Sequence, residues 1–147
     1  MKSIVVAAII AGTILAAIPA RAEGESVSFA AAIAPEQAFE VCFKGDALSA
    51  AQCALDKCRK ETGGSDECVI TSACTNGWAG SMGVTTGEVH WTETVCGAPN
   101  EAAVIAALTA FCKGQAKHAT ECFLASVWDS HGKEKSIGKT LYPRKLK

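Results

Sequence analysis

Two cysteines and a histidine near the C-terminus have the residue types of a zinc site. Cys112, His118 and Cys122 lie within 11 residues of one another, and zinc is bound by thiolates and imidazoles in tetrahedral geometry. The same pair of cysteines recurs 54 residues earlier, but there Gly64 stands in place of the histidine. The histidine is therefore not part of the repeated pattern, and we expect no metal.

A thiol-redox centre is a second chemistry open to cysteines. Such centres typically use two cysteines separated by two residues, with a lowered thiol pKa. The closest pair here, Cys53 and Cys58, has four residues between its members. We therefore expect all the cysteines to be structural, and no cofactor.

General acid–base chemistry has one candidate pair. In an extended strand from Glu88 to Val95, alternation places Glu88 and His90 on the face opposite Trp91, and a carboxylate beside an imidazole can orient it for proton transfer. The chain contains no Gly-x-Ser-x-Gly nucleophile motif. We assign no catalytic residue, and a small hydrolase-like enzyme centred on His90 and Glu88 is the alternative function.

Aromatic residues offer a binding surface instead. Of the three tryptophans, Trp128 follows a predicted strand and precedes a polar stretch that contains His131. We expect Trp128 to be partly exposed at the end of a sheet, where tryptophan commonly anchors a protein partner. The candidate partner-binding residues are Trp128, His131, Trp91, His90 and Glu88.

The N-terminus has the pattern of an export signal. Residues 4–18 form an uncharged, mostly apolar run after Lys2, and Ala20-Arg21-Ala22 matches the small-x-small cleavage pattern. That run is shorter than the roughly 20 residues of a membrane-spanning helix. We predict a signal peptide over residues 1–22 and a periplasmic or secreted mature chain, with no stable membrane span after cleavage.

The predicted mature chain has the length of a single domain. It carries 12 basic and 15 acidic residues, a net charge of −3, which argues against nucleic acid as a partner. Six Lys or Arg residues but only one acid follow Ser130. We expect residues 131–147 to be a basic, flexible tail, and deletion of residues 133–147 to leave the thermal midpoint nearly unchanged.

Eight cysteines in a short exported chain indicate a disulfide framework. Three of them recur at one period, because adding 54 to positions 42, 58 and 68 gives 96, 112 and 122, which are all cysteine. Unrelated spacings that recur together indicate an internal repeat. We place the two units at about 28–75 and 76–129, within one domain that ends near residue 130.

Local patterns give each unit the same elements. Asp46 and Asn100 can cap helices over 47–60 and 101–113. Strands are expected at 28–33, 37–43, 78–85 and 88–96, and further strands begin at Cys68 and Cys122. The predicted order is ββα-ββα-β, an α+β fold with one mainly antiparallel sheet and both helices on one face.

The repeat also predicts how the cysteines pair. Cys58–Cys68 and Cys112–Cys122 would each join a helix to the strand after it. The remaining repeated cysteines, Cys42 and Cys96, would then join the two units. Cys53 and Cys74, which have no repeat counterpart, would form the fourth bond, although Cys53 could instead reach another chain.

The second unit resembles a known family. Trp78-Ala79-Gly80, the hairpin after it, the alanine-rich helix ending in Phe111-Cys112, and Cys122 are similar to the domain of unknown function 4189, a family of small secreted bacterial domains. The resemblance spans roughly residues 28 to 130, but Cys53 and Cys74 are not part of the family pattern. It implies secretion and brings no catalytic residues.

Together these patterns favour an exported binding module over an enzyme. Its expected partner is another protein or an envelope component, and inhibition of a hydrolase is one concrete form of that function. The outer side of the second helix is rich in alanine, so a second copy of the chain, giving a homodimer, is a further candidate partner.

Overall fold

The computed structural model describes residues 27–146, so the predicted signal peptide and its cleavage site lie outside the described residues. The elements in order are β1 (Ser28–Ala34), β2 (Ala38–Lys44), α1 (Ala47–Glu61), β3 (Val69–Cys74), β4 (Trp78–Thr85), β5 (His90–Ala98), α2 (Glu101–Gly114), β6 (Glu121–Trp128), β7 (Glu134–Leu141) and a 3-10 turn, η1 (Pro143–Lys145). All strand pairs are antiparallel, so the predicted α+β class is confirmed.

The two helices begin and pack in the same way. The Asp46 carboxylate accepts a hydrogen bond from the Ser49 N–H at 2.8 Å, and the Asn100 side chain accepts one from the Ala103 N–H at 2.9 Å. Each helix buries one residue per turn, at Ala50, Ala54 and Cys58 in α1 and at Val104, Leu108 and Cys112 in α2. The two sets differ by 54 residues, so the repeat is present in the packing as well as in the sequence.

The strands form two sheets rather than the predicted single sheet. The first sheet has the order β2-β1-β3 and the second the order β5-β4-β6-β7. Each unit therefore places its first strand between its other two, and the order 2-1-3 recurs as 5-4-6. Both edges of β1 and both edges of β4 are paired with strands of their own unit, so neither strand has a free edge for the other unit.

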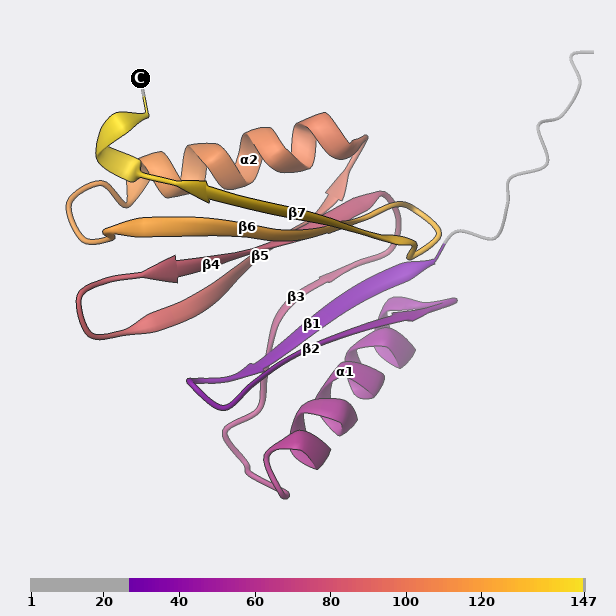
Figure 1. Cartoon of the computed structure of the whole chain (residues 1–147). Coiled ribbons are helices and arrows are strands. Elements are labelled where there is room, and N and C mark those ends of the chain that lie inside the picture. Colours follow the sequence, from indigo (N-terminus) through magenta and orange to yellow (C-terminus); the bar gives the residue numbers. More distant parts are fainter. Residues whose placement is uncertain (1–26, 147) are drawn as a thin grey trace, which may run out of the picture.

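The two units instead stack through their sheets. Figure 1 shows α1 on the outside of the first sheet and α2 on the outside of the second, with the sheets between them. A buried cluster joins the facing sides, to which the first sheet contributes Phe29, Ala31 and Val41 and the second contributes Ala79 and Trp128. β1 is apolar on both faces because one face meets α1 and the other meets the second sheet.

The approach of α2 to β4 depends on a glycine. A Cβ atom on Gly80 of β4 would overlap the Cγ1 methyl of Val104 and lie 3.3 Å from a Leu108 methyl, whereas Gly83 on the same strand has nothing within 4 Å. We predict that Gly80→Ala lowers the free energy of unfolding by about 1–3 kcal/mol through overpacking, and that the control Gly83→Ala does not. Urea denaturation measures both variants, and equal stability of the two would contradict this packing.

The predicted C-terminal tail is largely a strand. β7 pairs with β6 from Trp128↔Glu134 to Cys122↔Leu141, and Leu141 is only 6 % exposed within the α2 core. The Lys135 ammonium also contacts the Glu101 carboxylate of α2 at 2.6 Å. The expectation of a flexible tail is thus wrong for residues 134–141. Their charged side chains mark an exposed edge strand, where lysine is common.

Two of the four predicted disulfides are confirmed. Cys58–Cys68 and Cys112–Cys122 each join a helix to the following strand segment, with Cα–Cα distances of 6.0 and 6.1 Å. The other two predictions are wrong, because the remaining bonds are Cys42–Cys53 and Cys74–Cys96. No described cysteine is free.

A one-residue difference in register explains the exchanged partners. In the first unit Ala31 pairs with Ser72 and Val41. In the second unit the equivalent position is Ser81, because it pairs with Ser126, the residue 54 positions after Ser72. On its other side Ser81 pairs with Thr94, whereas the residue 54 positions after Val41 is Val95.

Because a slip of one residue turns a strand's side chains to the opposite face, Cys42 and Cys96 point in different directions. Cys42 faces α1 and bonds to Cys53 there, whereas Cys96 faces the first sheet and bonds to Cys74. The bond between the units is therefore Cys74–Cys96 and not the predicted Cys42–Cys96.

Candidate functional site

The two sheets are held together at one end. The Trp128 ring lies 5.7 Å from the Phe29 ring and 6.2 Å from the Phe43 ring, measured between centroids. The Cys74–Cys96 disulfide and a 2.7 Å hydrogen bond between the Ser72 and Thr94 hydroxyls also link the sheets. These contacts fix the angle at which the two units meet.

Away from these contacts the sheets enclose open space. A larger cavity of about 430 Å³ lies between β2 and the second sheet, all four strands of which contribute to its lining, and a smaller one of about 200 Å³ lies between the β1–β2 turn and the start of β5. Phe39 and Thr92 line both cavities. We therefore treat them as one feature, the inter-sheet groove, with the residues of both cavities as its lining.

The groove opens on the β2 side because the two sheets differ in width. The Phe43–Trp128 contact places the end of β2 opposite β6, and a Cβ atom on Gly132 in the β6–β7 turn would be 2.8 Å from the Phe43 ring. The start of β2 lies nearer β5, because Phe39 lines both cavities together with Thr92. β7, the fourth strand of the second sheet, has no counterpart beside β2. The second sheet thus extends past the first as an uncovered floor.

Aromatic side chains line the larger cavity. Phe123 on β6 is 46 % exposed, while Trp128 on the same strand is 5 % exposed and buried against the first sheet. Phe39 of β2 forms part of the opposite wall. An apolar surface is thus accessible inside a hollow, which is the usual form of a ligand site.

Charged groups surround the same cavity. Lys57 reaches from α1 across the edge of β2, and its ammonium donates to the Val41 carbonyl at 3.0 Å. Glu134 on β7 accepts a hydrogen bond from the Ser126 hydroxyl, and Glu40 lies beside Val41 on β2. The rim therefore carries one ammonium and two carboxylates.

The β6–β7 turn that supports this rim is held by one carboxylate. Asp129 Oδ1 accepts hydrogen bonds at 2.9 Å from the backbone N–H groups of His131 and Lys133. The bond from Lys133, followed by that from His131, holds the pKa of the Asp129 carboxyl below its usual value. This contribution to stability is present above the ordinary carboxyl pKa and is lost as the pH falls through the lowered one.

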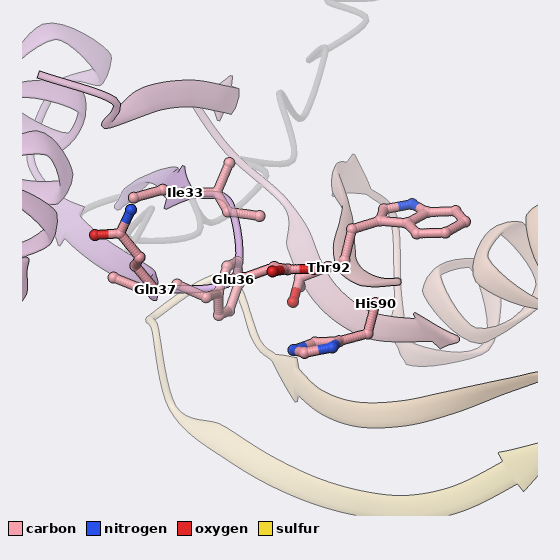
Figure 2. Close-up of a pocket in the computed structure, with 9 residues that line it drawn as sticks. Ile33, Glu36, Gln37, His90 and Thr92 are labelled. Carbon is pink, nitrogen blue, oxygen red and sulfur yellow. The ribbon is translucent and has the colours of Figure 1, made fainter. Parts of the chain in front are cut away.

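The smaller cavity brings together residues from both units. In Figure 2, Glu36 extends from the β1–β2 turn toward Thr92, and the His90 imidazole lies beside them. Gln37 points the other way and donates to the Glu67 carboxylate at 2.6 Å. The polar groups that meet at this end of the groove thus include a carboxylate, an imidazole and a hydroxyl.

Glu36 holds an unusual backbone conformation at this turn. Its φ is +58°, and the Gln37 N–H donates to the Ala34 carbonyl at 3.0 Å, as in a type II turn with Pro35 at its second position. Glycine or asparagine is the usual residue where Glu36 stands. The strained turn directs a carboxylate into the groove.

Three of the five candidate residues from the sequence, His90, Trp91 and Trp128, line the inter-sheet groove, whereas Glu88 and His131 do not. His90 lines the groove, but Glu88 lies in the exposed turn before β5 and is not among the lining residues. Trp128 is buried, which contradicts its predicted partial exposure, because both Phe29 and Phe43 cover it.

The other two candidates, Trp91 and His131, differ in whether they reach the groove. Trp91 packs against the α2 core and donates its indole N–H to Glu93 at 2.7 Å, although it contributes to the wall of the smaller cavity. His131 is exposed in the β6–β7 turn.

Sequence reasoning did not single out Phe123 or Lys57. The signal for Phe123 was its place between Cys122 and Leu124, whose burial against α2 turns the intervening ring to the other face. The role of Lys57 depends on how α1 lies over β2, which no local pattern encodes.

Comparison of the chain with protein-family models, curated proteins and solved structures gives no match. The resemblance to the domain of unknown function 4189 therefore remains a prediction. Four disulfides are typical of an oxidising compartment. No helix within residues 27–146 is long and apolar enough to span a membrane.

Proposed function

We propose that this protein is an exported, non-enzymatic binding module that holds a partner protein in the inter-sheet groove. The observation that carries the proposal is the larger cavity, in which the exposed Phe123 ring lies between the two sheets. Its volume of about 430 Å³ is within the usual range for ligand sites. The proposed location is the periplasm or the outside of the cell.

The walls of the groove favour binding because they are fixed before any partner arrives. The Cys42–Cys53 disulfide joins β2 to α1, and Cys74–Cys96 joins the two sheets. A preorganised site loses little conformational entropy on binding. Inhibition of a hydrolase is one activity that such a rigid surface supports.

The geometry favours a binding module over the hydrolase-like alternative. An enzyme centred on His90 and Glu88 would need both side chains at one site, and Glu88 lies outside the groove lining. Turnover that His90→Ala abolishes without loss of the fold would be evidence for the alternative.

A matched pair of aromatic substitutions tests the groove. Phe123 is 46 % exposed in the groove, whereas Phe111 is 36 % exposed on α2, outside it. We predict that Phe123→Ser weakens capture of a stoichiometric partner from envelope extract by about tenfold or more, and that Phe111→Ser does not.

Thermal unfolding of both variants checks that each keeps the native fold. Capture that is equally strong with wild type and with Phe123→Ser, or weakened only by Phe111→Ser, would contradict the groove as the binding surface.

A further inference from the structure

We propose that the partner enters the inter-sheet groove as a single extended peptide strand, which adds to the free edge of β2 and places an acidic side chain beside Lys57. This inference rests on the proposed function, because it describes how the groove binds. The partner is thereby assigned a chemistry: an extended segment with apolar residues at alternate positions and one acidic residue beside Lys57.

The first support is the direction of the β2 backbone. β2 is an edge strand, and the Val41 carbonyl accepts a hydrogen bond from Lys57, so that carbonyl points away from β1. In an antiparallel ladder both backbone groups of a residue point to the same side, and residues two apart share that side. Phe39, Val41 and Phe43 therefore present their N–H groups outward, whereas Glu40 and Cys42 bond to β1.

The second support is the space next to that edge. The larger cavity is walled by Phe39 and Val41 of β2 on one side and by residues of β4 and β6, among them Phe123, on the other. Glu134 of β7, the outermost strand of the second sheet, lies at its rim. A strand placed beside β2 would lie over this floor. Its inward side chains would cover Phe123, which is 46 % exposed without a ligand.

The same geometry argues for a single strand rather than a second copy of this chain. If β2 of a second copy paired with β2, its own second sheet would extend toward the same space that β7 occupies. Two β7 strands would then meet beneath the shared edge. An isolated peptide strand brings no second sheet, so the site has room for it.

Lys57 favours one acidic side chain on the incoming strand, at the position beside Val41, whereas Glu40 and Glu134 on the same rim disfavour a segment that is acidic throughout. The Lys57 ammonium donates to the Val41 carbonyl, and the described residues give it no carboxylate partner. An incoming backbone N–H would take over the Val41 carbonyl and release the ammonium. A carboxylate on the incoming strand can then pair with Lys57, which is the arrangement expected when backbone bonds give affinity and side chains give specificity.

A defined probe tests this inference on the full mature protein. A phage-displayed library of random 12-residue peptides is selected against the wild type and against Lys57→Glu. We expect the wild type to enrich peptides that carry one acidic residue among alternating apolar ones, and Lys57→Glu to enrich peptides with a basic residue at that position.

The best wild-type peptide is then synthesised in two forms, N-methylated at odd or at even positions. Strand addition uses the N–H groups of alternate residues, so one form should bind about tenfold or more weakly and the other nearly normally. On binding, amide hydrogen exchange should slow at Phe39, Val41 and Phe43. The amides of Glu40 and Cys42 should already exchange slowly in the free protein.

Equal affinity of the two methylated forms, or unchanged exchange at Phe39, Val41 and Phe43, would overturn strand addition. If a selected peptide gives either of these results but still binds the Phe123→Ser variant more weakly than the wild type, the groove remains the binding site and only strand addition is wrong. If the library yields no peptide sensitive to either Phe123→Ser or Lys57→Glu, both the mode and the proposed function fail.

Discussion

Deletion of residues 133–147 is expected to cost about 4 kcal/mol or more of unfolding free energy, a large share of the 5–15 kcal/mol typical of a domain. β7 covers one edge of β6, and it brings Leu141 into the core beneath α2. Pro143 is buried just beyond it. Thermal and urea unfolding, followed by circular dichroism, measure the loss.

Two adjacent substitutions make this prediction testable even if the truncated chain cannot be purified. Leu141 is 6 % exposed and Tyr142 is 47 % exposed. Leu141→Ala should cost about 2–4 kcal/mol, and Tyr142→Ala about 0.5 kcal/mol or less, as is usual for exposed sites. An unchanged midpoint after truncation, or equal effects at these two positions, would show that the C-terminal segment does not dock.

Removal of either repeated disulfide should destabilise the protein by a similar amount, about 2–5 kcal/mol. Cys58–Cys68 and Cys112–Cys122 each span ten residues, and all four sulfur-bearing side chains are buried. The double variants Cys58→Ala/Cys68→Ala and Cys112→Ala/Cys122→Ala provide the comparison, by urea denaturation. A negligible effect of one variant beside a large effect of the other would contradict equivalent roles in the two units.

The elements that sequence reasoning predicted correctly are those encoded by neighbouring residues. Asp46 and Asn100 lie at the helix N-termini, where their side chains cap the first turn, and the buried positions follow at helical spacing. Cys58–Cys68 and Cys112–Cys122 followed because each joins adjacent elements within one unit. In such cases the sequence pattern and the contact span the same few residues.

The features that sequence reasoning missed depend on contacts between distant segments. The β1–β2 and β4–β5 pairings differ in register by one residue, and this decides which way Cys42 and Cys96 point. The local signal is Gly97, which follows Cys96 within β5 with a φ of +79° where the first unit has Phe43, since glycine inside a strand often marks a bulge. The sequence predicts a tail where β7 lies, because Leu141 is the only one of the eight β7 residues that is buried. The groove itself follows from the unequal widths of the two sheets, so its lining could not be assembled from local patterns.

The stacking of the two sheets is the central claim, because the groove exists only between facing sheets. Its most direct test is a digest of unreduced protein with trypsin and a glutamate-specific protease. Complete cleavage places Cys96 in fragment 94–101, Cys74 in fragment 68–88 and Cys42 in fragment 41–44. Mass spectrometry should find fragment 94–101 linked to fragment 68–88, because Cys96 faces the first sheet and bonds to Cys74. Fragment 94–101 linked to fragment 41–44 would contradict the stacked sheets and the groove between them.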